Sequence, residues 1–248
     1  MSFGDDDAMK PLFSIITVCL NENPGIRRTC ESIIGLAHED YEWIVIDGAS
    51  NDGTLEILGE YKDSITCLVS EPDLGIYDAM NKGIAKAQGE YLIFMNGGDC
   101  FASPEVLTWA AAAPRKDLIY GNIFHDEPER HLVLSPERMN QGYLLKNMVP
   151  HQATFYHHTL FERFGKYDTS FRIAGDYDLY VRLLEIGRVS HHHINQPLAV
   201  FDLTGISNSE AFRALRKQEN HRIRMKYFRR YRWSLKALRQ KIRDRRCK

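Results

Sequence analysis

The chain has 248 residues, of which 44% are hydrophobic, and this proportion is enough to bury the core of one large α/β domain with an appendage. Its five cysteines are an odd number with no CxxC pair, which argues against a disulfide framework or a cysteine metal site and favours reduced thiols in a cytoplasmic protein. The formal net charge of -1 conceals a strong asymmetry, because 16 of the 32 lysines and arginines lie from Arg213 onward. A basic segment of this kind favours contact with an anionic membrane surface or with nucleic acid.

Short β-branched runs alternate with helical patterns through the first hundred residues. The expected strands lie at 13–19, 43–47, 67–70 and 91–95, and the expected helices at 25–36, 53–61 and 76–87. This alternation predicts βαβ units, and hence a Rossmann-like, mostly parallel sheet flanked by helices over residues 11–100. Residues 1–10 are expected to be a leader that is disordered or foreign to the natural chain.

The pattern changes in the second half, residues 101–210. The expected elements are a helix at 104–113, strands at 118–124 and 132–134, an ambiguous segment at 139–146, and a helix at 176–186. That last helix is amphipathic and is ended by Gly187. Its apolar side chains are Tyr180, Leu183 and Leu184. The remaining unit, residues 211–248, is a basic tail that we expect to be helical over residues 211–246.

Acidic and amide side chains follow the strands of the predicted sheet. Asn21 and Glu22 follow the first strand, Asp47 ends the second, and Asp99 follows the fourth. In an open α/β sheet, ligands bind at these carboxyl ends of the strands. Neither the GxGxxG motif of a dinucleotide fold nor a GxxxxGK[ST] phosphate loop is present. Because carboxylates repel a diphosphate, an acidic nucleotide site requires a bridging Mg²⁺ or Mn²⁺ with oxygen ligands.

The segment DGASNDGT, which begins at Asp47, permits two interpretations. The Asp47 carboxylate could accept a hydrogen bond from the imide N–H of a uracil, with Gly48 and Gly53 allowing the backbone to turn tightly beside the base. Alternatively, the segment is a turn in which Asp52 or Ser50 caps the next helix. The sequence leaves both interpretations open.

Four segments, in this order, resemble the inverting family 2 glycosyltransferases of the bacterial surface-polysaccharide type, which have the GT-A fold. The segments are SIITVCLNEN, YEWIVIDGASNDGT, EPDLGIYDAMNKGIAKAQGEYLIFMNGGD and AGDYDLYVRLLEIG. The resemblance covers residues 12 to about 205. It implies a nucleotide-sugar-binding half over residues 11–100 and an acceptor-binding, catalytic half over residues 101–210.

The resemblance also implies roles for individual residues. Asp99 matches the metal ligand, Asp47 the aspartate that contacts the base, and Asp176 the catalytic base that takes the proton of the acceptor hydroxyl. The implied nucleotide-sugar contacts are Thr17, Asn21, Glu22, Asp47, Gly48, Ser50, Asp52, Gly75, Asn81, Lys82, Asn96 and Gly98. The implied reaction moves a sugar, with inversion, from a nucleotide-sugar, with a UDP-sugar favoured, to a saccharide or polyprenyl-linked saccharide.

The chain departs from the family pattern at three places. The metal motif is reduced to NGGD at residues 96–99, so we expect the substrate phosphates to complete the metal site. Gly175 precedes Asp176 where the pattern has an acidic pair. Met80 stands in place of an arginine, and Lys82 is the candidate for supplying the missing positive charge.

Several other side chains have a functional and a plain structural interpretation. His151, in PHQ, is a candidate contact for the diphosphate or the acceptor, or a structural histidine. Asp178 is the alternative base or acceptor contact, and otherwise lies on the helix surface or pairs with Arg182. The run His191 to His193 resembles a metal cluster, but alternate side chains of an extended segment point to opposite faces, which disfavours a metal site there.

The tail interleaves cationic and aromatic side chains, as in helices that lie on anionic membranes. This interpretation places residues 213–248 on the inner face of the plasma membrane, near a lipid-linked acceptor. Alternatively, the tail is a solvated basic helix whose aromatic side chains pack on the domain. A nucleic-acid-binding protein and a nucleotidyltransferase are rival classes. The acidic cleft argues against the first, so that no nucleic-acid partner is expected, and the order of the segments argues against the second.

Overall fold

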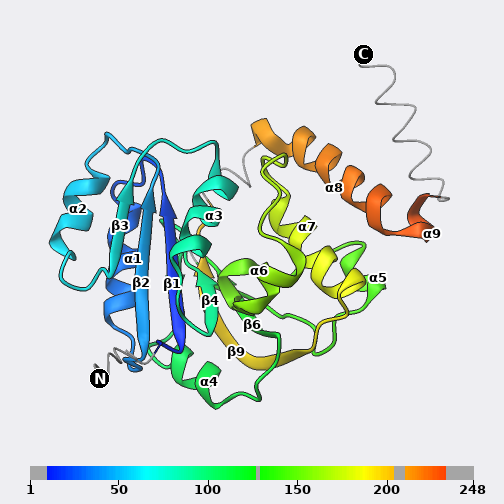
Figure 1. Ribbon diagram of the computed structural model, residues 1–248, viewed down its shortest axis with the longest axis horizontal. Helices are drawn as coiled ribbons and strands as arrows, with labels where there is room; N and C mark the ends of the chain where they lie inside the picture. Colours follow the sequence, from blue (N-terminus) through cyan, green and yellow to red (C-terminus); the bar gives the residue numbers. More distant parts are fainter. Residues whose placement is uncertain (1–9, 127–128, 204–209, 233–248) are drawn as a thin grey trace, which may run out of the picture.

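The strands expected in the first half form the parallel side of a single sheet (Figure 1). The computed structural model describes residues 10–126, 129–203 and 210–232. Over these residues, nine strands pair into one sheet with the order β3-β2-β1-β4-β8-β6-β9-β5, and β7 pairs with β6. The parallel strands are β1 (Phe13–Cys19), β2 (Tyr41–Asp47), β3 (Cys67–Ser70) and β4 (Tyr91–Phe94). Their bounds agree closely with the predicted strands.

Alternation of apolar side chains along β1 explains why helices cover both faces of this part of the sheet. Ile15 belongs to one core with side chains of α1 and α2, and Ile16 belongs to the other with side chains of α3. These helices are α1 (Gly25–Ile34), α2 (Thr54–Glu60) and α3 (Ile76–Lys86). Helix α3 approaches the sheet closely because Gly83 lacks a side chain. A Cβ atom at Gly83 would lie 2.4 Å from Cγ2 of Ile16.

The second half extends the same sheet with strands that run in both directions. Strand β8 pairs antiparallel to β4 and β6, β9 pairs parallel to β6, and β5 and β7 join antiparallel at β9 and β6. The bounds are β5 (Cys100–Phe101), β6 (Leu118–His125), β7 (His131–Val133), β8 (Thr154–His157) and β9 (His191–Phe201). The sequence analysis missed β8 and β9, so the parallel arrangement that it predicts describes the first half, whereas the second half is mixed.

The helix predicted at 176–186 is present but changes its winding partway along. It consists of α7 (Gly175–Val181) and a π-helical turn, η2 (Arg182–Ile186). Tyr180 and Leu183 are fully buried, as the amphipathic pattern predicts. Gly187 follows with a φ of -75°, and the left-handed residue after this helix is Arg188, with a φ of +48°. The other short helices of this half are α4 (Val106–Ala112), α5 (Gln141–Leu144), η1 (His151–Ala153) and α6 (Thr159–Phe164).

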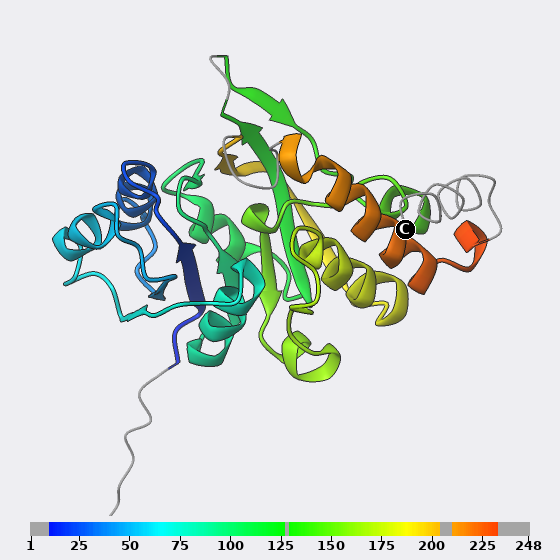
Figure 2. The ribbon, with the colours of Figure 1, turned by 90° about the horizontal axis from the view of Figure 1, so that it is seen from above.

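The described part of the tail packs on the second half. Helix α8 lies beside α7 in both views (Figures 1 and 2), and Ile223 and Phe228 are fully buried. Phe228 is extended and interrupts the single helix predicted over 211–246, of which residues 233–246 lie outside the described part. The tail elements are η4 (Glu210–Phe212), α8 (Arg213–Tyr227) and α9 (Arg229–Arg232). None of the helices within the described ranges is long and apolar enough to cross a lipid bilayer.

Candidate active site

Acidic side chains from four loops meet at the carboxyl ends of the strands. Glu22 follows β1, Asp52 follows β2, Asp99 follows β4 and Asp202 follows β9. Burial, together with the negative charges of the other three carboxylates, raises the pKa of Glu22 to about 7. The loops are packed tightly, because a Cβ atom at Gly98 would lie 2.8 Å from Oδ2 of Asp202. The strand ends therefore hold a cluster of carboxylates at one edge of the sheet.

Asp99 is buried at this edge and is held by contacts from three parts of the chain. Its Oδ1 accepts a hydrogen bond from the backbone N–H of Asp202 at 2.8 Å, and its Oδ2 accepts one from Nε2 of Gln152 at 2.8 Å. Thr29 Oγ1 donates to the carbonyl oxygen of Asp99 at 2.6 Å and accepts from the N–H of Gly98 at 3.0 Å. Burial raises the pKa of Asp99 to about 6. Its position is therefore fixed before any ligand binds.

Carboxylate oxygens of this cluster suit Mg²⁺ or Mn²⁺, and a cation there would relieve the repulsion that raises the pKa of Glu22. Both oxygens of Asp99 already accept a hydrogen bond from the protein. No group of three or more His, Cys, Asp or Glu side chains within the described residues is arranged to hold a metal. The described residues alone therefore do not complete a metal site, and a cation here would need further ligands from a bound diphosphate, which agrees with the single carboxylate of the NGGD motif.

The loop after β1 is connected to the loop after β2 by side-chain hydrogen bonds. The N–H of Asn21 donates to Oγ of Ser50 at 2.8 Å, and the N–H of Asn23 donates to Oδ2 of Asp52 at 2.9 Å. Asp47 is fully buried and accepts hydrogen bonds from the N–H of Ser50 at 3.0 Å and from Oγ of Ser70 at 2.7 Å. These contacts agree with a turn at DGASNDGT, but neither Asp52 nor Ser50 is the cap residue: the N-cap of α2 is Gly53, without a side-chain cap hydrogen bond, and Asp52 accepts from the N–H of Thr54 at 3.0 Å. The contact of Asp47 with a base stays a prediction.

Two of the residues that the resemblance assigns to the nucleotide form their hydrogen bonds with other parts of the protein. Thr17 is fully buried in the middle of β1, and its Oγ1 accepts a hydrogen bond from Nε1 of Trp43 at 3.0 Å. Asn81 exchanges hydrogen bonds with the backbone of Tyr167, at 3.0 Å and 2.9 Å. The structure does not bring either side chain to the carboxylate cluster.

Three further implied contacts, Gly48, Gly75 and Lys82, lie around the loop between β3 and α3. Lys82 forms an ion pair with Glu71 at 2.8 Å and lies 3.6 Å from Asp78. Gly75 has a φ of +120° at the start of α3. A Cβ atom at Gly48 would lie 2.6 Å from Oδ2 of Asp73, so this loop approaches the turn after β2.

Three candidate residues that are distant in sequence meet beside Asp99. Nε2 of His151 lies 3.1 Å from Nδ2 of Asn96, and Nδ1 of His151 lies 3.7 Å from Oδ2 of Asp176. Oδ1 of Asn96 and Nδ1 of His151 are buried with no hydrogen-bond partner. Unsatisfied buried polar atoms are uncommon in folded proteins, and a bound ligand or a water molecule would satisfy these two. Asn96 lies in the turn that contains Asp99, and His151 lies between Asn96 and Asp176.

Asp176 is oriented by neighbours on two elements. Its Oδ1 accepts a hydrogen bond from the N–H of Tyr177 at 2.8 Å and lies 3.2 Å from the hydroxyl of Tyr77. Burial raises the pKa of Tyr77, so this hydroxyl keeps its proton. A Cβ atom at Gly175 would lie 2.7 Å from Cε2 of Tyr77, which explains why no acidic residue stands before Asp176 in this chain.

Asp178 has a different environment from Asp176. It is fully buried, its Oδ2 accepts a hydrogen bond from Nε of Arg182 at 2.8 Å, and its Oδ1 accepts one from the hydroxyl of Tyr227 at 3.1 Å. The Arg182-pairing alternative therefore describes Asp178, and its position in the core disfavours both the helix-surface alternative and a contact with an acceptor.

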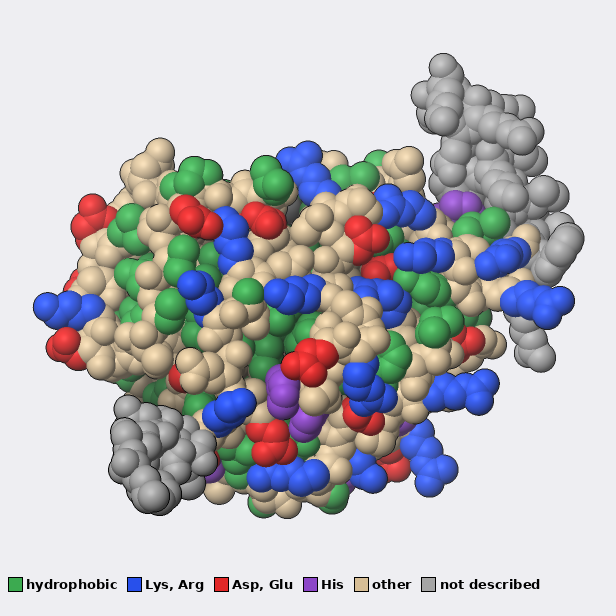
Figure 3. Space-filling model, viewed as in Figure 1, with side chains coloured by type: hydrophobic (Ala, Val, Ile, Leu, Met, Phe, Trp, Pro, Cys, Tyr) green, Lys and Arg blue, Asp and Glu red, His purple; other side chains and the backbone are tan. Residues whose placement is uncertain are grey.

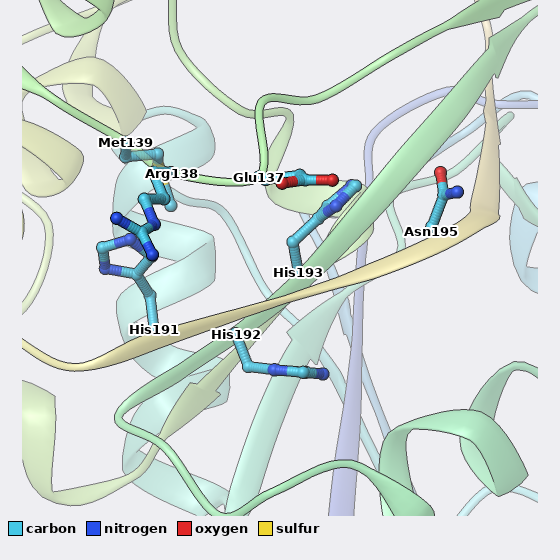
Figure 4. Close-up of a pocket in the computed structure, with 7 residues that line it drawn as sticks. All are labelled: Glu137, Arg138, Met139, His191, His192, His193 and Asn195. Atoms are coloured by element: carbon cyan, nitrogen blue, oxygen red, sulfur yellow. The ribbon is translucent and has the colours of Figure 1, made fainter.

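The three histidines of β9 line a separate pocket of about 560 Å³. Figure 4 shows His191 and His193 on the side of Glu137 and Arg138, and His192 on the other side of the strand, as expected for an extended segment. Nε2 of His193 lies 3.1 Å from Oδ1 of Asn122, and burial lowers the pKa of His193. Within the described residues these histidines do not belong to a metal-binding group.

Sequence analysis missed three residues that build the site. Asp202 follows β9, so the rule that selects strand ends would have found it if β9 had been predicted. Gln152 lies next to His151 in PHQ, but this motif indicates only the histidine as a candidate. Thr29 lies within α1, and nothing in its local sequence indicates that it orders the turn before Asp99.

Solved structures with this architecture define its class. TarS of S. aureus, residues 1–349 in complex with UDP-GlcNAc, superposes with a TM-score of 0.67 at 17% identity over 78% of this chain and 58% of that chain. The mannosyltransferase PcManGT from Pyrobaculum calidifontis, in complex with GDP-Man and Mn²⁺, gives a TM-score of 0.65 at 20% identity over 89% and 65%. The fold is therefore the GT-A fold of glycosyltransferases, as the sequence predicts.

Sequence relatives agree with this class. An uncharacterized glycosyltransferase of Mycobacterium tuberculosis is 32% identical over 80% of this chain and 78% of its own length. A PGL/p-HBAD biosynthesis glycosyltransferase of Mycobacterium bovis is 28% identical over 80% of each chain. The chain belongs to glycosyl transferase family 2, whose model matches residues 14–171. It is a glycosyltransferase, and the predicted family is confirmed.

Proposed function

We propose that this glycosyltransferase transfers a sugar from a nucleotide-sugar, with a UDP-sugar favoured, to a saccharide or lipid-linked saccharide, with inversion at the anomeric carbon. The observation that carries the proposal is the row of contacts from Asn96 through His151 to Asp176. It places the carboxylate of Asp176 beside the turn that contains Asp99. A donor bound at Asp99 would present its sugar toward Asp176. The unpartnered atoms of Asn96 and His151 are then available to the sugar or the diphosphate.

Related proteins support the classes of donor and acceptor. TarS and PcManGT are described with UDP-GlcNAc and with GDP-Man and Mn²⁺, respectively. A putative teichuronic acid biosynthesis glycosyltransferase of Bacillus subtilis is 36% identical over 36% of this chain and 37% of its own length. These names support a nucleotide-sugar donor and an acceptor that belongs to polysaccharide or glycolipid synthesis.

In the proposed mechanism, Asp176 takes the proton of the acceptor hydroxyl while the acceptor oxygen attacks the anomeric carbon. The bond from that carbon to the diphosphate breaks, and its electron pair leaves with the nucleoside diphosphate. The N–H of Tyr177 holds Oδ1 of Asp176, and the hydroxyl of Tyr77, which also donates to the carbonyl oxygen of Ile173 at 2.7 Å, lies 3.2 Å from the same oxygen. Oδ2, on the side of His151, is left for the acceptor. Asp99, next to Glu22 and Asp202, would hold Mg²⁺ or Mn²⁺, and such a cation would supply positive charge that stabilises the departing diphosphate.

A screen of nucleotide-sugars tests this function. The full chain is incubated with UDP-, GDP-, dTDP- and CDP-sugars, with Mn²⁺ or with EDTA, and release of nucleoside diphosphate is measured. We expect release from a UDP-sugar that depends on Mn²⁺. Calorimetric titration with the four nucleoside diphosphates is the companion measurement. The proposal fails if no nucleoside diphosphate is released and no nucleotide binds.

The exposed face of the tail supports a second part of the proposal, contact with an anionic membrane on the cytoplasmic side. Lys and Arg side chains gather over α8 and α9 in Figure 3, and Arg213, Lys217 and Arg229 are exposed. The apolar side chains Ile223 and Phe228 are buried in the domain. We therefore propose that this contact is electrostatic and that the buried side of α8 stays on the domain.

Sedimentation with vesicles tests the membrane contact without removing α8. Wild-type protein and a triple variant, Arg213→Glu, Lys217→Glu and Arg229→Glu, are mixed with phosphatidylglycerol-containing vesicles and with neutral phosphatidylcholine vesicles. We expect the wild type to bind the anionic vesicles at low salt and the variant to lose this binding. Equal sedimentation of the two proteins would end the proposal.

A further inference from the structure

Glu219 lies on the buried side of α8, within the most basic part of the chain. It is one of two acidic residues from Arg213 to the C-terminus, and only 6% of its surface is exposed. An acidic side chain in a basic helix ordinarily lies in solvent and pairs with its neighbours. The burial of Glu219 therefore requires specific partners.

The partners of Glu219 are backbone N–H groups directly before Asp176. Its Oε1 accepts a hydrogen bond from the N–H of Arg172 at 2.8 Å. Its Oε2 accepts hydrogen bonds from the N–H groups of Ile173 at 2.9 Å and Ala174 at 2.8 Å. Hydrogen bonds to an ionised carboxylate are stronger than those between neutral groups, so this contact fixes the segment firmly.

Glu219 holds the backbone that leads into α7. The N–H groups that it binds belong to residues 172–174, of which Ala174 is the cap residue, and not to the first turn of the helix. Ala174 stands at the cap position of α7 and makes no capping hydrogen bond with its side chain. The carboxylate that binds the backbone at this end comes instead from α8, 45 residues further along the chain.

Other contacts between α8 and α7 act in the same place. The hydroxyl of Tyr227 donates to Oδ1 of buried Asp178 at 3.1 Å. Nε of Arg224 lies 3.3 Å from the hydroxyl of Tyr177, whose N–H holds Asp176. The tail helix thus contacts the chain both before and after Asp176.

We propose that Glu219 is a positioning residue for sugar transfer. It holds the backbone of residues 172–174 so that the carboxylate of Asp176 faces His151 and the acceptor. The inference rests on the proposed function, in which Asp176 is the base. It gives the first turns of the tail a role in catalysis that is separate from any contact with a membrane. A displacement of about 1 Å in such a group can lower a rate by about 10²-fold.

The variant Glu219→Gln tests this role, with Glu210→Gln as the matched control. Glutamine has the size of glutamate but offers one acceptor oxygen, and its amide group repels the remaining N–H donors. Glu210 lies in the same tail, and its side chain is 84% exposed. We expect Glu219→Gln to lower kcat by about 10- to 100-fold with unchanged donor KM and unchanged Kd for the nucleoside diphosphate. The control is expected to match the wild type.

Combination with Asp176→Asn separates positioning from general loss of stability. If Glu219 acts through Asp176, Glu219→Gln lowers kcat no further in the Asp176→Asn background. Effects that multiply, or a wild-type kcat in Glu219→Gln, would overturn the inference. Should Glu219→Gln not fold, Glu219→Asp, which keeps the charge on a shorter side chain, is expected to lower kcat about tenfold at unchanged Kd. A wild-type kcat in that variant would likewise overturn it.

The same experiments distinguish the inference from the proposed function. If Asp176→Asn is as active as the wild type, the proposed mechanism fails and the role of Glu219 fails with it. If Asp176→Asn is inactive while Glu219→Gln is fully active, only the positioning role fails.

Discussion

The donor side and the acceptor side of the site are held in place by different kinds of contact. Around the donor, the loops that follow the strands bind one another: Ser50 and Asp52 accept hydrogen bonds from the loop after β1, and Asp99 accepts one from the N–H of Asp202. Around the acceptor, Asp176 lies beside His151, and Glu219 of the tail helix binds the backbone just before it. We therefore expect changes on the acceptor side to lower turnover while leaving nucleotide affinity intact.

Asp176→Asn is expected to give the largest loss of turnover with unchanged nucleotide affinity. Removal of a general base typically lowers the rate by about 10²- to 10⁴-fold, and the amide still accepts a hydrogen bond from Tyr177. Turnover is measured by release of nucleoside diphosphate, and nucleotide affinity by calorimetry. Asp63→Asn, an exposed substitution between α2 and β3, is the control. Unimpaired turnover would remove Asp176 from the mechanism.

A smaller loss of turnover is expected from His151→Gln, because His151 lies between the donor side and the acceptor side of the site. Glutamine keeps a polar group near Asn96 but cannot reproduce both ring contacts. Loss of an orienting contact of this kind lowers kcat by about 10- to 100-fold. The measurement is kcat and donor KM with the sugar identified by the screen. A variant in which only the donor KM rises would assign His151 to the donor side.

Two glycines allow the same substitution to be compared on the two sides. Gly175→Ala would place a Cβ atom 2.7 Å from Tyr77, and such overpacking destabilises a protein by about 1–3 kcal/mol. Gly59→Ala, within α2, meets nothing within 4 Å and is expected to stabilise the fold by about 0.5–1 kcal/mol. Urea unfolding measures both. Equal effects would show that Gly175 is not constrained by Tyr77.

The smallest effect concerns pH and the carboxylates of the donor side. The pKa values of Glu22 and Asp99 are raised to about 7 and about 6. Each group binds protons more strongly when the chain is folded, so its contribution to stability is present at low pH and is lost as the pH rises through the folded value. Without metal, we expect the melting temperature to fall between about pH 5 and pH 8.

The variant Glu22→Gln isolates this contribution. In EDTA at pH 8, it is expected to raise the melting temperature by roughly 2–4 °C and to change it much less at pH 5. Thermal unfolding of Glu210→Gln at the same two pH values is the control. Equal shifts at both pH values would contradict the raised pKa of Glu22.

The parts of the fold that local pattern specifies could be predicted from sequence. The strand at Phe13–Cys19 is a buried β-branched run, and the structure confirms it residue for residue. Strand β9 was missed because it begins with three histidines and contains Asn195, Gln196 and Pro197, which are uncommon in strands. Because one sheet runs through both halves, the domain division at residue 100 stays a prediction.

The residues of the site show the same limit of prediction from local sequence. The strand-end rule found Asp99 and Glu22, since their place follows from the sheet alone. The motif PHQ indicated His151 as a candidate, whereas the contact of Glu219 with the backbone before Asp176 could not be found from sequence, because it arises only through tertiary packing. Glu219, surrounded in sequence by basic residues, has the local pattern of a solvent-exposed side chain.

The central claim is that the donor binds between Asp99 and Asp176. A crystal structure of the chain with Mn²⁺ and the nucleotide-sugar identified by the screen tests it most directly, with Asp176→Asn used to prevent turnover. We predict the diphosphate and Mn²⁺ beside Asp99, and the anomeric carbon between them and residue 176. A nucleotide bound elsewhere, such as in the pocket of His191 and His193, would contradict the account.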